Sequence, residues 1–263
     1  GITADLEAMK RVGIGGVLIM EVDQGAPVGP ADFMGASWRD LFQHVHAEAR
    51  RLGLEVNMNN DAGWNGSGGP WIKPEQSMQE VVWTETNIAG GQHFEGTLAK
   101  PEATAGFYRD IAVQAFPSVG DFRIPNIQTK AAFQKSGQHK PSKGDLAPDS
   151  IIPSHAPTDL TPQMDASGRF VWDVPPGQWT VIRYGHTSTG VENSPAPKSG
   201  RGLECDKLSK AGIEANFAGM MAKLATVVGQ SSRLPKSLRP SRSQLQPAGE
   251  TPAGTNASED ARA

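Results

Sequence analysis

Over roughly the first 80 positions of the chain, segments with helical spacing of hydrophobic residues alternate with segments that have the spacing of a strand. Helical spacing is found in residues 3–12 and 37–52, and each of these segments is followed by glycine. Between and after them, residues 17–22 form a dense apolar run and residues 54–59 alternate apolar with polar side chains. Helices that alternate with strands through short connections predict a parallel sheet, which is either a (β/α)8 barrel or a doubly wound sheet.

The two expected strands differ in where their polar side chains lie. The apolar run at residues 17–22 is typical of a parallel strand that is buried on both faces. In residues 54–59, side chains alternate between the two faces, so one face is apolar and the other carries Glu55, Asn57 and Asn59. A flat sheet covered by helices on both faces would leave such polar groups buried without partners. This pattern therefore favours the barrel.

The spacing changes from about residue 82 onward. Pro74 and Glu75 predict the start of another helix that runs through Val81. Beyond it, short segments rich in β-branched and aromatic residues are separated by Gly, Pro and Asp, which predicts an inserted antiparallel β-module. The expected divisions are residues 1–81 (first βα units of a barrel), 82–196 (β-module with a long loop at about 120–165), 197–230 (return to a barrel helix, with helical spacing in 207–228) and 231–263 (disordered tail rich in Ser, Pro and Arg).

Composition and charge exclude several classes of protein. The formal net charge is -3, and no basic stripe marks a nucleic-acid surface. The longest apolar run, near Val17 to Met20, is far too short to span a bilayer. Cys205 is the only cysteine, so an internal disulfide or a cysteine-based metal cluster cannot form. We therefore expect neither a nucleic acid nor a membrane as a partner.

Common catalytic motifs are absent from the sequence. Gly13, Gly15 and Gly16 precede a strand, whereas the glycines of a dinucleotide-binding motif follow one. The chain contains no phosphate-binding Gly-Lys-Ser/Thr element, no His-Glu-x-x-His and no Gly-x-Ser-x-Gly. Redox, kinase and serine-hydrolase functions are therefore disfavoured.

The loop that follows the second expected strand has the composition of a sugar-binding site. Asn59, Asn60 and Asp61 supply amide and carboxylate groups, Trp64 supplies a flat apolar ring, and four glycines at positions 63–69 allow close backbone approach. Sugars need oriented donors and acceptors for their hydroxyl groups and an aromatic face for the C–H side of the ring. The same composition also suits an ordinary surface turn.

Five carboxylates lie at or beside expected strand ends, namely Glu21, Asp23, Asp61, Glu204 and Asp206. A pair held across a cleft could act as general acid and base in glycoside hydrolysis. They could equally hold a hard cation such as Ca²⁺ or Mg²⁺. Strand-end acids also cap helices or form structural ion pairs, so this alternative stays open for each of them.

Four ordered blocks of the sequence resemble glycoside hydrolase family 106, the α-L-rhamnosidases. They are Gly1-Ile2-Thr3-x-Asp5-Leu6-Glu7-x-Met9-Lys10, Gly63-Trp64-x-x-Ser67-Gly68-Gly69-Pro70-Trp71, Tyr108-Arg109-Asp110-Ile111-Ala112-Val113 and Gly202-Leu203-Glu204-Cys205-Asp206-Lys207-Leu208-Ser209. The resemblance implies a (β/α)8 catalytic barrel with added β domains. It also implies inverting, calcium-assisted removal of rhamnose from plant polysaccharides or glycosides, in the periplasm or outside the cell.

The chain departs from the family pattern at both ends. Family members carry a strand before the position of Gly1 and, beyond the helix that follows Ser209, a strand with an Asp-Ser-Trp-Glu type of motif. We therefore expect a fragment whose catalytic acid and base lie outside this chain, and a tail after Ser231 that resembles a foreign or frameshifted end. The expected sugar contacts are Glu21, Asp23, Asn59, Asn60, Asp61 and Trp64, and the expected calcium ligands are Glu204 and Asp206.

Two hypotheses follow from these expectations. The chain is part of a rhamnosidase-like enzyme, or it is a non-catalytic truncated product that at most binds carbohydrate weakly, because half a barrel leaves open sheet edges and an unfilled core. A more distant alternative is another carbohydrate-active barrel with a similar cleft.

Overall fold

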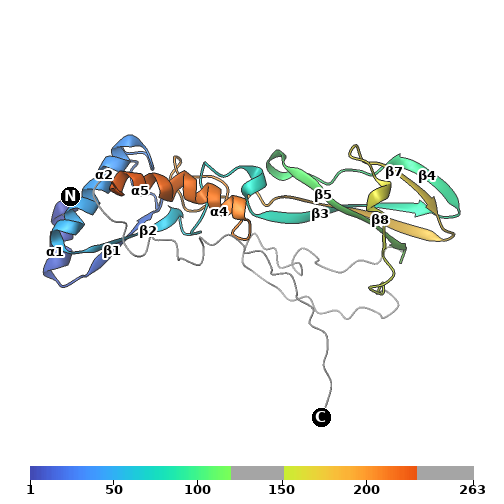
Figure 1. Cartoon of the computed structure of the whole chain (residues 1–263), viewed down its shortest axis with the longest axis horizontal. Helices are drawn as coiled ribbons and strands as arrows, with labels where there is room; N and C mark the ends of the chain where they lie inside the picture. Colours follow the sequence, from blue (N-terminus) through green and yellow to red (C-terminus); the bar gives the residue numbers. More distant parts are fainter. Residues whose placement is uncertain (120–150, 230–263) are drawn as a thin grey trace, which may run out of the picture.

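A computed structural model describes residues 1–119 and 151–229 as an elongated molecule with two lobes. Figure 1 shows α1, α2, β1 and β2 at one end and the long strands β3, β5 and β8 with β4 and β7 at the other. The first lobe and its helices contain α1 (Ile2–Arg11), β1 (Gly16–Glu21), α2 (Ala36–Leu52), β2 (Glu55–Ala62), α4 (Lys210–Asn216), the π-helix η5 (Phe217–Met221) and α5 (Ala222–Gly229). The second lobe contains β3 (Gln79–Ala89), β4 (Gln92–Thr97), β5 (Tyr108–Pro117), β6 (Thr158–Asp159), β7 (Arg169–Val174) and β8 (Gln178–Ser188). Short 3-10 helices are η1 (Pro74–Gln76), η2 (Thr104–Gly106) and η4 (Thr161–Gln163).

The parallel pairing predicted for the first two strands is confirmed. β1 pairs with β2 in parallel, with Val17 opposite Val56. The connecting helix α2 ends at Gly53, whose left-handed backbone (φ 65°) turns the chain into β2. Side chains of α1, α2, β1 and β2 bury a shared core that contains Leu6, Ala49, Leu54 and Val56. The helices thus cover one face of the two-stranded sheet.

The prediction that β1 is buried on both faces is wrong for the described residues. Leu18 and Met20 are 60% and 43% exposed, and the neighbouring Glu55 and Asn57 of β2 are exposed as well. The face that carries these side chains has no covering layer in residues 1–119 and 151–229. The described strands form two-stranded and four-stranded sheets and no closed barrel, so the predicted partial barrel is not confirmed. The fold that is present is a mixed α/β fold with antiparallel sheets.

The antiparallel sheets predicted beyond residue 82 are present. β3, β8, β5 and β6 form a sheet in that order, and β4 pairs with β7 beside it. Their shared core is built around Phe170, Val113, Val181 and Leu98, each at most 1% exposed. β4 and β6 are additional strands that the sequence pattern did not predict, and β6 lies within the expected loop at 120–165.

The helix predicted to start at Pro74 is wrong beyond its first turn. Pro74 begins the 3-10 helix η1, which ends at Gln76, and β3 starts three residues later. Val81 lies in β3 and pairs with His186 of β8. The β-branched residues that follow Met78 fit a pleated strand better than a helix. The hydrogen bonds between β3 and β8 stabilise the strand.

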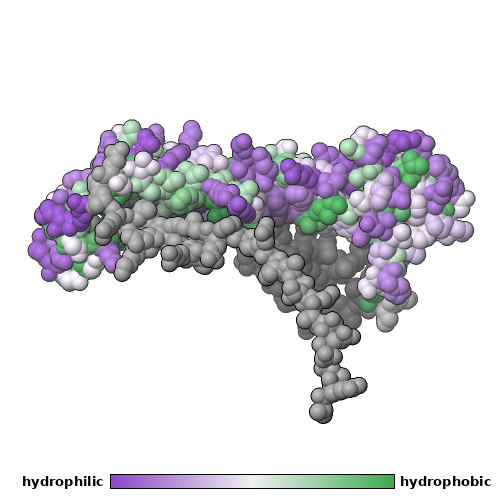
Figure 2. All heavy atoms as spheres, viewed as in Figure 1, coloured by the Kyte–Doolittle hydropathy of each residue, from purple (hydrophilic) through white to green (hydrophobic). Residues whose placement is uncertain are grey.

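The helical spacing of residues 207–228 is confirmed by α4, η5 and α5. Met220 and Leu224 pack against Trp38 and Phe42 of α2. Figure 1 shows α5 beside α2 and α4 extending toward the second lobe. Leu208 lies before α4 and is exposed. Figure 2 shows apolar residues on the surface of this helical segment, in agreement with the exposure of Ile213 and Phe217.

Two sequence predictions fall largely outside the described residues. The tail 231–263 and most of the expected loop at 120–165 belong to this group. Among the described helices, none has both the length and the apolar content that a bilayer span requires.

Candidate functional site

The loop after β2 is held in place by backbone hydrogen bonds to segments far away in the sequence. Gly63 N donates to Glu21 O (2.7 Å), Trp64 N to Ser194 O (3.0 Å) and Gly69 N to Leu203 O (3.2 Å). Gly68 has φ +120°, and a Cβ there would lie 2.9 Å from Leu203 O. Glycine is required at such a position. The loop is therefore clamped between the end of β1 and the segment that follows β8.

Asp61 is the buried carboxylate at the base of this loop. It is 0% exposed, and its Oδ1 accepts hydrogen bonds from Asn59 Nδ2 (2.7 Å) and Gly66 N (3.1 Å). Within the described residues, Oδ2 has no hydrogen-bond partner, and neither does Ser67 Oγ. Burial raises the pKa of Asp61 to about 6, because the N–H groups of Gly66 and Ser67 offset the loss of hydration only in part.

Glu204 is a second buried carboxylate that acts on Asp61. Its charge adds to the rise in the pKa of Asp61, and the nearby Lys207 ammonium opposes it. One oxygen of Glu204 accepts from Asn65 Nδ2 (3.1 Å), and the other pairs with Lys207 Nζ. The structure therefore brings together two acids that lie far apart in the sequence.

The carboxylates of Glu21 and Asp23 accept hydrogen bonds from groups outside the loop that follows β2. The Oε2 of Glu21 accepts a hydrogen bond from Trp38 Nε1 (3.0 Å), and Trp38 packs between Phe33 and Phe42. The carboxylate thus points toward α2, although the Cα of Glu21 is paired with Ala62 in the sheet. Asp23 accepts from Gly25 N (3.1 Å) in a turn. The strand ends lie side by side as expected, and the side chains of Glu21 and Asp61 bind different partners.

The remaining predicted sugar contacts are at the surface. Trp64 is 61% exposed, which leaves its indole face accessible. Asn60 is exposed, and its carbonyl accepts from Asn216 Nδ2 (3.3 Å). Asn59, by contrast, has its amide engaged by Asp61 and by Gly63 O (2.7 Å).

Glu204 and Asp206 do not fit a shared calcium site. Calcium takes six to eight oxygen ligands in proteins, yet one oxygen of Glu204 is paired with an ammonium group. Asp206 Oδ1 accepts from Leu208 N (2.9 Å) in the turn before α4. The described ranges contain no group of three or more His, Cys, Asp or Glu residues placed to hold a metal ion. Calcium binding by this protein stays a prediction.

Two buried amides that organise the site were not predicted. Asn216 Oδ1 accepts from Gly68 N (3.0 Å) and Trp71 Nε1 (3.1 Å). Asn193 Nδ2 donates to Ala62 O (2.6 Å) and Gly200 O (3.0 Å). Both amides are at most 2% exposed. Asn216 could have been recognised from the sequence, because an asparagine stands there at a buried position of a helical spacing pattern. Asn193 lies in an irregular segment, where no such pattern marks a buried residue.

Comparisons with known proteins give a family model, a curated relative and a solved structure of similar fold. The family model described as alpha-L-rhamnosidase matches residues 1–125 and 115–236. A curated relative from Formosa agariphila, named "Putative beta-glucuronidase", is 42% identical over 241 residues, which are 87% of this chain and 20% of the relative.

A solved structure has a similar fold. The rhamnosidase from Novosphingobium sp. PP1Y superposes with a TM-score of 0.66 at 21% identity, over 87% of this chain and 35% of that one. The chain therefore spans about a fifth of the length of the curated relative and about a third of the solved chain.

Proposed function

We propose that this chain, which belongs to the alpha-L-rhamnosidase family of glycoside hydrolases, is part of an enzyme that releases α-L-rhamnose from plant polysaccharides or glycosides. In this proposal β1 and β2 are the first strands of a partial (β/α)8 barrel, and the loop after β2 contacts the sugar. The family assignment supports a carbohydrate substrate. The choice of rhamnose rests on the family description, because the curated relative carries the name of a different glycosidase.

The observation that carries this proposal is the pairing of a buried acid with an exposed indole on one loop. Asp61 has a carboxylate oxygen with no partner among the described residues, and Trp64, three residues away, is largely exposed. Asp61 is fully buried in this structure, so a hydroxyl group of a sugar stacked on the indole would reach the carboxylate only if the glycine-rich loop shifts. With a pKa of about 6, Asp61 can accept or donate that hydrogen bond near neutral pH.

The proposed reaction is an inverting hydrolysis. It needs one carboxylic acid to protonate the leaving oxygen and one carboxylate to activate water, roughly 6.5–9.5 Å apart. We assign neither role to a described residue and propose that both groups lie in the remaining length that the relatives possess. Asn59, Asn60, Asp61 and Trp64 would then bind and orient the sugar, with Glu21 and Asp23 beside them.

Replacing Asp61 with asparagine is expected to weaken the binding of methyl α-L-rhamnoside about tenfold, because an amide cannot supply the charged acceptor. Asn retains the shape of Asp and can still accept from Gly66 N, so the loop should remain folded. Isothermal titration calorimetry on this chain measures the affinity, and release of the aryl group from an aryl α-L-rhamnoside measures turnover.

The matched control is Asp159→Asn, which changes an exposed aspartate that caps a turn in the β-module through Thr161 N. This variant should bind the rhamnoside like the unaltered chain. Equal affinities for the Asp61 and Asp159 variants would refute the role of Asp61. An aryl β-glucuronide bound more tightly than the aryl rhamnoside would replace rhamnose by glucuronate. A panel of other aryl glycosides, ranked by affinity, would reveal a different carbohydrate-active protein.

The alternative is a non-catalytic product that binds carbohydrate weakly or not at all. The open face of the β1–β2 sheet, which carries the exposed Leu18 and Met20, favours it for the chain taken alone. Absence of measurable rhamnoside binding by this chain would support this alternative.

The raised pKa of Asp61 predicts that its contribution to stability falls as pH rises. The folded state holds this proton up to about pH 6, whereas the unfolded chain releases it near the ordinary value of 3.8. The contribution is therefore full below about pH 4 and is lost between about pH 4 and pH 6, by about 3 kcal/mol. Urea unfolding at several pH values, with Asp61→Asn subtracted from the unaltered chain, isolates this effect. A flat difference over that interval would contradict the prediction.

A further inference from the structure

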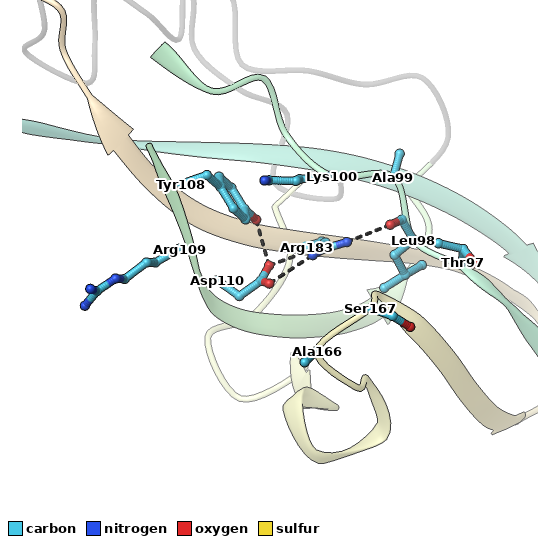
Figure 3. Close-up of a pocket in the computed structure, with 10 residues that line it drawn as sticks. All are labelled: Thr97, Leu98, Ala99, Lys100, Tyr108, Arg109, Asp110, Ala166, Ser167 and Arg183. Carbon is cyan, nitrogen blue, oxygen red and sulfur yellow. Dashed lines mark hydrogen bonds and ion pairs between the residues drawn. The ribbon is translucent and has the colours of Figure 1, made fainter. Parts of the chain in front are cut away.

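A pocket of about 570 Å³ lies in the β-module, apart from the loop that carries Asp61. It opens between β5, β8 and the segment that follows β4, and Figure 3 shows the side chains that line it. Its volume is in the range of small-molecule sites in proteins. The proposed function does not use this pocket.

Arg183 is the buried cation in the wall of the pocket. It is only 5% exposed, and its guanidinium makes three hydrogen bonds, to Asp110 Oδ1 (2.7 Å), Asp110 Oδ2 (2.9 Å) and Leu98 O (2.8 Å). A guanidinium has five N–H donors. One donor on each terminal nitrogen is not used in these three bonds, and the Tyr108 hydroxyl also interacts with the guanidinium.

Asp110 pairs mainly with Arg183, and the charge of Lys100 is a smaller cause that lowers the pKa of Asp110. Its two oxygens accept from Arg183, and one of them also accepts from Tyr108 Oη (2.7 Å). Hydrogen bonds from Arg183 are the largest cause that lowers the pKa of Asp110 below its usual range, so it is ionised at neutral pH. Asp110 and Arg183 thus cancel each other in charge.

Lys100 is the charge that remains. Its ammonium lies 4.8 Å from the centre of the Tyr108 ring, it lines the same pocket, and within the described ranges it forms no salt bridge. Tyr108 can lie across the sheet because position 185 beneath it is glycine, where a Cβ would be 2.3 Å from the ring. Arg109 also lines the pocket, but Figure 3 shows its side chain directed away from the ion pair.

We propose that this pocket binds the carboxylate of an acidic sugar, as a subsite separate from the loop after β2. The Lys100 ammonium and the N–H donors of Arg183 that neither Asp110 nor Leu98 uses supply positive charge and directed hydrogen bonds, and both suit a carboxylate. The surrounding hydroxyl and backbone groups of Thr97, Ala99 and Ser167 suit sugar hydroxyls. The binding of a carboxylate is argued from the pocket itself, and the choice of a sugar as the molecule that carries the carboxylate rests on the proposed function.

The test is calorimetric titration of this chain with digalacturonic acid and with its methyl ester, which has the same rings and no charge. The acid is expected to bind at least about tenfold more tightly than the ester, and Lys100→Gln should remove about tenfold of the affinity for the acid. Lys100→Arg, which keeps the charge, should stay within about threefold. Because Lys100 is exposed, none of these changes threatens the fold.

Lys223→Gln is the matched control, since Lys223 is an exposed lysine on α5, outside the pocket. It should bind the acid like the unaltered chain. Equal binding of acid and ester, or equal affinity of the Lys100→Gln and Lys223→Gln variants, would overturn the proposal. Monomeric galacturonate binding as tightly as the disaccharide would assign the pocket to a free sugar acid and not to a polysaccharide unit.

The two proposals fail separately. Asp61→Asn should weaken rhamnoside binding and leave the affinity for digalacturonic acid unchanged. Binding of the acid without any binding of rhamnoside would contradict the proposed function alone. Binding of rhamnoside without any binding of the acid would contradict the pocket alone.

Discussion

Asp110→Ala is expected to lower the free energy of unfolding by about 3 kcal/mol, because it leaves the guanidinium of Arg183 buried without its counter-charge. Arg183 is 5% exposed and donates hydrogen bonds to both oxygens of Asp110. The loss of the Tyr108 hydrogen bond to the same carboxylate adds to the effect. Urea unfolding, followed by tryptophan fluorescence, measures the change.

The control for this experiment is the exposed pair Arg169–Glu95, whose side chains are each 55% exposed. Its geometry is also close (2.7 Å), but water screens it, so Glu95→Ala should cost less than about 1 kcal/mol. If both alanine variants were destabilised equally, burial of Arg183 would not be the cause. The comparison separates the effect of burial from the effect of ion-pair distance.

Asn216→Leu is the second substitution with a large expected effect, a loss of about 3 kcal/mol in unfolding free energy. The amide oxygen of Asn216 accepts from Gly68 N and Trp71 Nε1, and its nitrogen donates to Asn60 O. Leucine has a similar volume and leaves these buried groups without partners, which costs more than the lost hydrogen bonds themselves. Chemical denaturation measures the free energy of unfolding. Titration with the rhamnoside measures whether the loop still binds the sugar with the same affinity.

Asn57→Leu serves as the matched control, because Asn57 is exposed on β2. The same change of side chain there should alter the unfolding free energy by less than about 0.5 kcal/mol. Comparable losses in the two variants would show that leucine itself, and not the buried amide, is responsible. Asn216→Leu should also weaken rhamnoside binding, since the loop of Asp61 and Trp64 would lose its attachment to α4.

Much of the fold was predictable from the spacing of hydrophobic residues. The strands β3, β5, β7 and β8 are visible in the sequence because side chains on a sheet alternate between a packed and an exposed face. The pairing of β1 with β2 was predictable for a related reason, since a helix that ends in glycine can return the chain for parallel pairing. The position of Asp61 at the end of β2 also follows from this pattern.

The rest depended on contacts that local sequence does not report. β4 is short and polar apart from Phe94, and its formation depends on pairing with β7. Leu18 and Met20 have the composition of a buried strand, yet only one face of β1 is covered by described residues. Arg183 has the appearance of a solvent-facing strand residue, and only the register with β5 places Asp110 close enough to bury it.

The glycine at position 185 gives β8 two opposed properties. Glycine is a poor strand former, so it weakens β8 within the four-stranded sheet. Its bare Cα also leaves space for an aromatic ring to lie flat over the neighbouring strand. A weaker position in β8 thus gives the Tyr108 phenol space above the Arg183–Asp110 ion pair. A larger residue at position 185 would fill that space and displace the ring.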